Sequence, residues 1–252
     1  MGKQGWLRAG IAGAIAGAAM ALAALTGGVA EATHGVALDH FKCYLTQDQT
    51  PWNQQVILAD QFIQAGFPAT VLNAMRFCNP TRKFHAGAVT PIKDPDAHLT
   101  MYGLGPLPGP IQRQVLVGNQ FGPQQAWVVN GPYWLAVPTQ KQGHPEGPHH
   151  LDHFVCYRAS GPAVNQAVGL RDEFLGEIVG VTMPALFCNP AKKEHNGVVT
   201  PVEHPDAHLA CYTILGQQGM RARWVRNQFG IEQLAIAGAR MLCVPSSKQV
   251  ID

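Results

Sequence analysis

A short segment of this chain has the residue types and the spacing of a metal site. His204, Asp206 and His208 occupy alternate positions, and alternate side chains of an extended strand lie on one face. Two imidazoles and a carboxylate form a ligand set that suits Zn²⁺ or Cu²⁺. An earlier segment repeats part of this pattern with Asp96 and His98. The candidate metal ligands are these five residues and two further matched histidines, His85 and His195.

The recurrence of one histidine position also supports a structural interpretation. His40, His98, His153 and His208 each open the same short motif, which ends in tyrosine. A residue that every copy keeps is expected to serve the fold, here through a ring bonded to a neighbouring turn. Four residues suit Asx-turns in the same way: Asp60, Asn119, Asp172 and Asn227. Prolines interrupt the proposed metal-binding strands, so a surface loop with incidental histidines is the alternative to a metal site.

A second group of residues could bind a partner by stacking or by charge. Exposed Trp and Tyr rings could stack on sugars, and Arg221 and Arg223 would share one face of a strand that could meet an acidic partner. Structural alternatives exist for both, since Tyr133 and Trp134 could fill core volume and the arginines could protect an edge strand. The candidate ligand-binding residues are Trp52, Trp127, Tyr133, Trp134, Arg221, Arg223 and Trp224.

Motifs of the common enzyme classes do not occur in the sequence. None of the three serines, Ser160, Ser246 and Ser247, lies in a Gly-x-Ser-x-Gly motif. A glycine-rich phosphate loop and a Cys-x-x-Cys-His haem site are also absent. We therefore expect a non-enzymatic protein without a cofactor. A hydrolase with paired carboxylates needs no local motif and stays an alternative.

The six cysteines occur as three pairs at matched spacings. Four repeat units each have an opening and a closing position, 35, 35, 32 and 32 residues apart, and the second unit has Met101 and Ala136 there. A joint loss is expected of disulfide partners, because one orphaned thiol is a liability in an oxidising compartment. The predicted disulfides are Cys43–Cys78, Cys156–Cys188 and Cys211–Cys243.

The elements that must position these residues are short strands. Runs of four to seven β-branched or aromatic residues alternate with Gly, Pro, Asn and Asp, and 27 glycines and 19 prolines leave little room for long helices. The sequence predicts an all-β fold of two tandem small β-sandwich or barrel domains, each built from two pseudo-symmetric three-stranded half-repeats and stapled by disulfides. The predicted boundaries are 1–32 for a signal peptide, 37–141 and 151–252 for the domains, and 142–150 for a linker.

The N-terminus is typical of a secretory signal peptide. Lys3 and Arg8 precede an uncharged stretch over residues 11–25, and small residues then suit cleavage near Ala32. This stretch is shorter than the roughly 20 residues that a membrane span needs, so we expect a secreted, periplasmic or extracellular product without a span in the mature chain. The net charge of +2 gives no reason to expect nucleic-acid binding.

The ordered motifs resemble a repeat found in many secreted bacterial proteins of uncharacterised function. They are Leu-Asp-His-Phe-x-Cys-Tyr, Asp-Gln-Phe, Phe-Cys-Asn-Pro-x-x-Lys, His-Leu-x-Cys-Tyr, Asn-Gln-Phe-Gly and Leu-Cys-Val-Pro-Ser-x-Lys. The resemblance covers nearly all of the mature chain in two tandem copies, and the first copy departs from it at Met101 and Ala136. It implies an exported domain stapled by disulfides, and it implies no activity.

These observations favour an exported, non-enzymatic binding or assembly module at or outside the bacterial cell surface. Its partner would be a protein or a polysaccharide there. The alternatives are a periplasmic or extracellular metal-binding protein, a hydrolase of extracellular polymers, and a fibre or coat subunit that assembles with itself.

Overall fold

A computed structural model describes residues 1–2, 38–47, 50–144 and 146–251. The predicted signal peptide and its cleavage position fall almost wholly outside the described residues. The described residues from Leu38 onward form one compact unit. In the described part of the chain, no helix has the length and apolar character that a membrane crossing requires.

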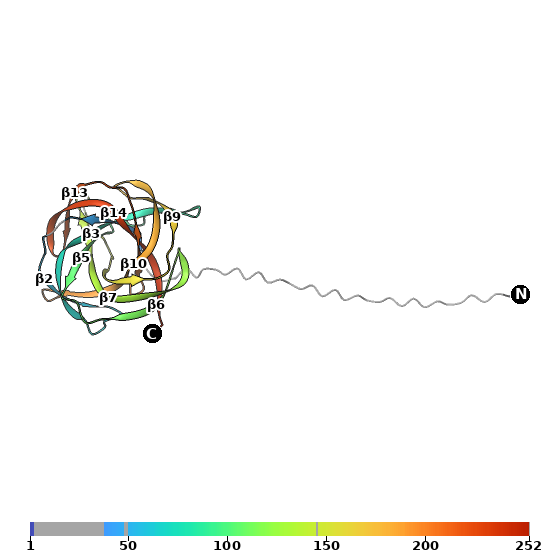
Figure 1. Cartoon of the computed structure of the whole chain (residues 1–252), viewed down its shortest axis with the longest axis horizontal. Coiled ribbons are helices and arrows are strands. Elements are labelled where there is room, and N and C mark those ends of the chain that lie inside the picture. Colours follow the sequence, from blue (N-terminus) through green and yellow to red (C-terminus); the bar gives the residue numbers. More distant parts are fainter. Residues whose placement is uncertain (3–37, 48–49, 145, 252) are drawn as a thin grey trace. The chain divides into compact units, whose positions relative to one another are not determined.

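Every element of the described chain is a β-strand (Figure 1). A first strand, a hairpin strand and a long strand follow one another in that order four times along the chain. The first quarter contains β1 (His40–Thr46), β2 (Gln54–Ala59), β3 (Phe67–His85) and β4 (Ala88–Thr90). The second contains β5 (His98–Gly105), β6 (Gln112–Asn119) and β7 (Gly122–Lys141). The third contains β8 (His153–Ser160), β9 (Gln166–Arg171), β10 (Gly176–His195) and β11 (Val198–Thr200). The fourth contains β12 (His208–Ile214), β13 (Arg221–Asn227) and β14 (Gly230–Val250), and the all-β prediction is confirmed.

Eight of the strands close into a ring of antiparallel pairs. Each quarter contributes its first strand and its long strand, which has 19 to 21 residues. The order around the ring is β1, β3, β5, β7, β8, β10, β12, β14 and back to β1. A closed ring satisfies the backbone groups that an open sheet would expose at its edges.

Strands of opposite quarters also pair with each other. Each long strand has a register shift in its N-terminal half, before the ring, and its C-terminal end continues past the ring to pair with a hairpin strand of the opposite quarter. These pairs are β10–β2, β3–β9, β14–β6 and β7–β13. The two sequence repeats therefore share one sheet and do not form two separate sheets. The physical reason is that the far end of each long strand needs a partner that its own repeat does not supply.

The ring strands bury side chains on both faces. In β1, Phe41 and Cys43 belong to a smaller core cluster and Tyr44 to a larger one, as alternation along a strand requires. The smaller cluster contains all six cysteines, which form the three predicted disulfides. In each disulfide the two cysteines lie directly opposite each other in the strand register. The sulfur atoms of Cys43 and Cys243 lie 3.9 Å apart, so two disulfides are in contact inside this cluster.

Candidate functional site

At four equivalent places an aspartate or asparagine of one quarter is hydrogen-bonded to a tyrosine of the opposite quarter, and we call these places corners. Two of the corners contain a buried aspartate. The Tyr157 hydroxyl donates to Asp60 Oδ1 at 3.0 Å, and Asn189 Nδ2 donates to Asp60 Oδ2 at 3.1 Å. In the reciprocal corner, the Tyr44 hydroxyl donates to Asp172 Oδ2 at 2.7 Å. The Asp60 carboxylate also accepts the Phe62 amide at 2.8 Å, which forms the predicted Asx-turn.

The other two corners use asparagine in the same place. Asn119 Nδ2 donates to the Tyr212 hydroxyl at 2.9 Å, and Asn227 Nδ2 donates to the Tyr102 hydroxyl at 2.6 Å. In all four corners a phenylalanine packs edge-on against the tyrosine, with ring centroids 5.1 to 5.6 Å apart. The recurring Asx-Gln/Glu-Phe turn therefore connects each quarter to the opposite one, through a hydrogen bond to its tyrosine and through aromatic packing.

The motif histidines are buried beside these corners, and two of them are bonded to the next quarter. His40 Nε2 lies 2.9 Å from Gln120 Oε1, and His153 Nε2 lies 2.8 Å from Gln228 Oε1. The predicted bond between the ring and a turn is confirmed for both. Burial lowers the pKa of each of these histidines to about 4, with neighbouring lysines adding to the effect. Both rings are therefore neutral near pH 7 and serve as fixed parts of the fold.

The corner around His98 differs from the other three. His98, the first residue of β5, is 1% exposed, and neither of its ring nitrogens has a hydrogen-bond partner among the described residues. The ring of His144, in the turn after β7, meets it edge-on with centroids 4.8 Å apart. Glu173, which follows β9, stands where the other corners have glutamine. Ligand atoms of the three residues all lie within 4.8 Å of one another, and no other group of this kind was found among the described residues.

Two charged neighbours complete this cluster. Asp96 Oδ1 contacts His144 Nδ1, and His144 Nε2 lies 3.4 Å from Glu173 Oε2. The Lys141 ammonium contacts the same Glu173 oxygen. Burial, with Lys141 and His144 nearby, lowers the pKa of His98 to about 2. The cluster thus has one neutral buried imidazole, a second imidazole oriented by a carboxylate, and one carboxylate oxygen shared with a lysine.

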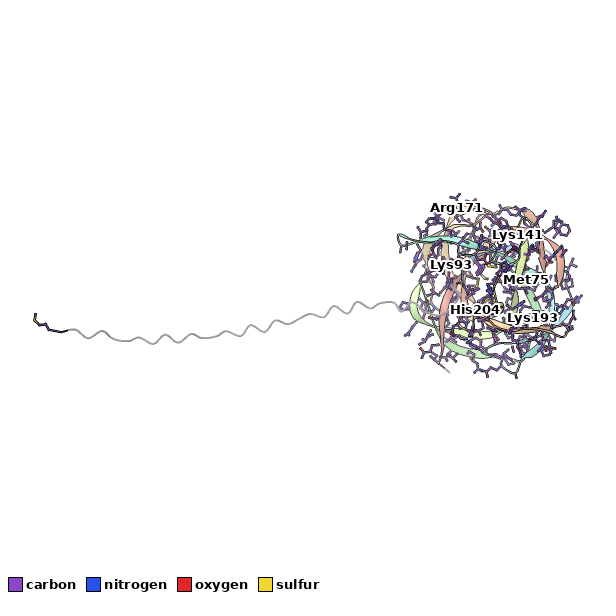
Figure 2. The ribbon with its side chains drawn as sticks, turned by 180° about the vertical axis from the view of Figure 1, so that it is seen from behind. Met75, Lys93, Lys141, Arg171, Lys193 and His204 are labelled. Atoms are coloured by element: carbon purple, nitrogen blue, oxygen red, sulfur yellow. A yellow bond between two sulfur atoms is a disulfide. The ribbon has the colours of Figure 1, made fainter. Side chains whose placement is uncertain are left out.

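Of the seven metal ligands predicted from sequence, His98 belongs to the three-residue group, and Asp96 contacts that group through His144. His85 lies 2.6 Å from Gln166 and His195 lies 3.2 Å from Gln54, each at the end of a long strand. His208 is buried against Phe187, and its amide donates to the Asp206 carbonyl. The His204 amide donates to Asp152 at 2.8 Å, and Figure 2 shows His204 in a different part of the unit from Lys141. The long strands carry His85 and His195 to other corners, where they pack on Phe121 and Phe229.

Two of the candidate ligand-binding tryptophans lie in the core. Trp127 is 1% exposed and Trp134 is 5% exposed, so neither ring is available to stack on an external sugar. Trp134 packs in the smaller cluster with Met101 and Ala136, which agrees with the volume-filling alternative. Tyr133 stacks on Trp134, and the Arg158 guanidinium lies 4.0 Å from the Tyr133 ring.

The other candidate ligand-binding residues lie nearer the surface. Trp52 packs against Gly230 and donates to Glu232 at 3.3 Å, and Trp224 is half exposed. Arg221 and Arg223 both lie over the Phe174 ring, 4.6 and 5.3 Å from its centroid. These two arginines therefore cover the corner next to His98.

An exposed basic and apolar face on β3, β9 and β10 was not identified from sequence. Arg82 lies directly opposite Arg171, and in the next row Phe84 and Ile178 flank Gly169. A Cβ at Gly169 would lie 3.2 Å from Phe84 Cβ, so the glycine lets the phenylalanine lie close to the sheet. We call these four side chains, Arg82, Phe84, Arg171 and Ile178, the arginine face. Figure 2 shows Arg171 at the margin of the unit.

The equivalent face of the other repeat is different in charge. It has Lys192 for Arg82, Glu194 for Phe84, Ala59 for Arg171 and Pro68 for Ile178. Two unlike charges there replace two like charges. Comparison of the repeats position by position is the sequence signal that could have identified the arginine face.

Comparison with known proteins gives one match. The family described as "Repeat of unknown function (DUF7450)" matches residues 106–245. No curated protein and no solved structure matches this chain.

Proposed function

We propose, from the premise that the chain belongs to this family of repeats of unknown function, that it is an exported, non-enzymatic module that binds an anionic polysaccharide on the arginine face. The matched pair Arg82 and Arg171 carries the proposal. Like charges directly opposite each other on neighbouring strands destabilise a sheet. An anionic group that contacts both guanidinium groups would remove that cost.

The charges of the arginine face are not neutralised within the described residues. No ion pair within 4.0 Å joins either arginine to a described carboxylate. The Arg82 guanidinium lies 5.2 Å from the centre of the Phe84 ring, and Arg171 lies over Gly176. Both guanidinium groups are thereby held at the surface, where charge-assisted hydrogen bonds to carboxylate or sulfate groups form readily.

The apolar part of the face supports an extended ligand. Ile178 is 81% exposed, and Phe84 and Val89 in the same row across the sheet are exposed as well. Val89 lies opposite Phe84, so one apolar row crosses β4, β3, β9 and β10. A polymer laid along this row would bring its apolar ring faces onto Phe84 and Ile178 and its acidic groups onto the arginines.

Export is the remaining part of the proposal. Three buried disulfides support it, because such bonds persist in oxidising compartments outside the cytosol. The N-terminal pattern of Lys3, Arg8 and the following apolar stretch supports it from the sequence. A cell-surface polysaccharide would then be accessible to the protein.

Titration calorimetry with polygalacturonate as the probe and neutral dextran as the control tests the proposal. The full chain should bind the anionic polymer and not dextran, and binding should weaken as salt screens the arginines. The double variant Arg82→Gln, Arg171→Gln should bind at least about tenfold more weakly, since each bidentate contact is worth more than about 1 kcal/mol. Lys192→Gln, at the equivalent place in the other repeat, is the matched control and should bind normally. Equal binding by the double variant and the wild type would exclude the arginine face as the site.

A further inference from the structure

The buried ring of His98 has no hydrogen-bond partner within the described chain. Both of its nitrogens are buried and unpartnered, although buried polar groups in folded proteins are nearly always bonded. The ring stacks on Phe77 and faces His144 edge-on. Such an imidazole has an unused lone pair that points into a protein interior.

The three equivalent corners act as internal comparisons for this one. The equivalent histidines His40 and His153 are bonded to Gln120 and Gln228. In the fourth corner, Gln61 donates to the Pro205 carbonyl and accepts from Lys248. Only the His98 corner has a carboxylate, Glu173, at the glutamine position and a second imidazole beside it. Two departures from the common pattern, the Glu173 carboxylate and the His144 imidazole, therefore occur together in the His98 corner.

The second imidazole is held in the orientation that a ligand needs. Asp96 contacts His144 Nδ1 and so fixes the proton there, which leaves His144 Nε2 facing Glu173. A carboxylate behind a ligating histidine is the usual outer partner in protein metal sites. The His144 amide also donates to the Lys141 carbonyl at 3.0 Å, so the turn itself is fixed.

We propose that His98, His144 and Glu173 bind one divalent transition-metal ion of the zinc class. Two imidazoles and one carboxylate are a ligand set that Zn²⁺ adopts, with a further position open to water. Their ligand atoms, within 4.8 Å of one another, need to close on the metal by a small amount, since Zn–N and Zn–O bonds are about 2.0–2.2 Å long. The Lys141 ammonium contacts Glu173 in this structure, and the metal ion would take its place as the cation bound to that carboxylate.

The site links three segments of the chain, one from each repeat and one from the stretch between the repeats. His98 begins β5, His144 lies in the segment between the two sequence repeats, and Glu173 follows β9 in the second repeat. A bound ion would join that segment to both repeats. Metal binding should therefore protect the segment around His144 from proteolysis and raise the unfolding temperature.

Zinc titration of the full chain, purified without a histidine tag, tests the inference by calorimetry and by metal analysis after dialysis. We expect one Zn²⁺ per chain, and we expect Co²⁺ to give the visible absorption of a tetrahedral site. Glu173→Gln introduces the residue that the three other corners already have, so the fold should be kept, and affinity should fall about 10- to 100-fold. His144→Ala should do the same from a position outside the strands.

His149→Ala is the matched control, because His149 lies in the same segment, is exposed and pairs only with Glu146 among the described residues. It should bind Zn²⁺ as the wild type does. Absence of stoichiometric binding, or wild-type affinity in Glu173→Gln and His144→Ala, would overturn the inference. The double arginine variant of the polysaccharide experiment should keep its zinc affinity, so the two proposals can fail separately.

Discussion

Met101 lies directly opposite Ala136 in the register of β5 and β7, at the place where the other three quarters have a disulfide. Both residues are fully buried in the cluster that contains the six cysteines. The shared loss of cysteine in one quarter thus corresponds to one missing covalent link across one pair of strands. Trp134 packs in the same cluster.

The first prediction is that Met101→Cys with Ala136→Cys forms a fourth disulfide. Direct register opposition places the two Cβ atoms as in the three natural pairs. Closing a loop of this length should stabilise the fold by about 3–4 kcal/mol in the chain-entropy account, and removal of the buried Met101 side chain should offset part of that gain. Mass analysis of non-reduced peptides and urea unfolding measure the bond and its effect. Reduction should return the double variant to wild-type stability or below, and a variant that stays reduced in air would contradict the prediction.

The cysteine spacing thus predicted the covalent framework, and strand patterns predicted the fold class. Neither predicted the ring. A pattern of burial tells which side chains are inside, but the partner of a strand depends on register with strands far away in sequence. The pairs β1–β14 and β3–β9 join residues of different repeats, and the comparison of repeats alone contained no signal for them.

The sequence predicted the candidate metal site only in part, because its ligands also come from segments that lie far apart in the sequence. The strand motif identified His98, but the other two ligands come from segments that no periodicity connects to it. The sequence predicts a linker over the segment that contains His144, and in the structure Asp96 and Lys141 hold this residue in place. Glu173 belongs to a turn motif whose other copies have glutamine. The sequence shows this replacement, but only the fold shows that Glu173 lies beside His98 and His144.

The second prediction concerns a buried ion pair. Lys42 Nζ lies 2.5 Å from Glu177 Oε1, and both side chains are almost fully buried. The equivalent residue in the second quarter is Thr100, which is also buried. Lys42→Thr should destabilise the fold by about 3–5 kcal/mol, because it leaves the buried Glu177 carboxylate without its cation and with only the Gln217 amide as a partner among the described residues. The double variant Lys42→Thr, Glu177→Gln should recover much of this loss in urea unfolding, and equal stability of the single and double variants would contradict the account.

The third prediction concerns the tyrosine corners. Tyr157→Phe removes the hydroxyl that donates to the buried carboxylate of Asp60. Hydrogen bonds to charged groups contribute about 1.5–3 kcal/mol, so the free energy of unfolding should fall by that amount. Tyr133→Phe, outside the four corners, is the matched control and should change stability by less than about 0.5 kcal/mol. Similar effects of the two substitutions would show that the corners do not stabilise the fold through this bond.

The fourth prediction concerns pH and the two histidines that are bonded to glutamine. Burial lowers the pKa of His40 and of His153 from 6.5 to about 4. Between these values the unfolded chain binds more protons than the folded one, so stability is complete above pH 6.5 and is lost as the pH falls toward 4. The charged neighbours that add to this effect are Lys83 and Lys93 for His40 and Lys193 for His153.

When the pH falls from 7 to 5, each of these histidines should lower the free energy of unfolding by about 2 kcal/mol, since one pKa unit corresponds to about 1.36 kcal/mol. His40→Gln with His153→Gln keeps a polar partner for Gln120 and Gln228 and removes both titrating rings. The double variant should therefore lose about 4 kcal/mol less than the wild type over this interval, as measured by urea unfolding at the two pH values. Burial raises the pKa of Asp39 and Asp60 above the ordinary aspartate value, so these two groups act in the opposite direction at pH values just above that ordinary value, and they are present in both proteins. An unchanged pH dependence in the double variant would therefore mean that the two rings are not held neutral by the fold.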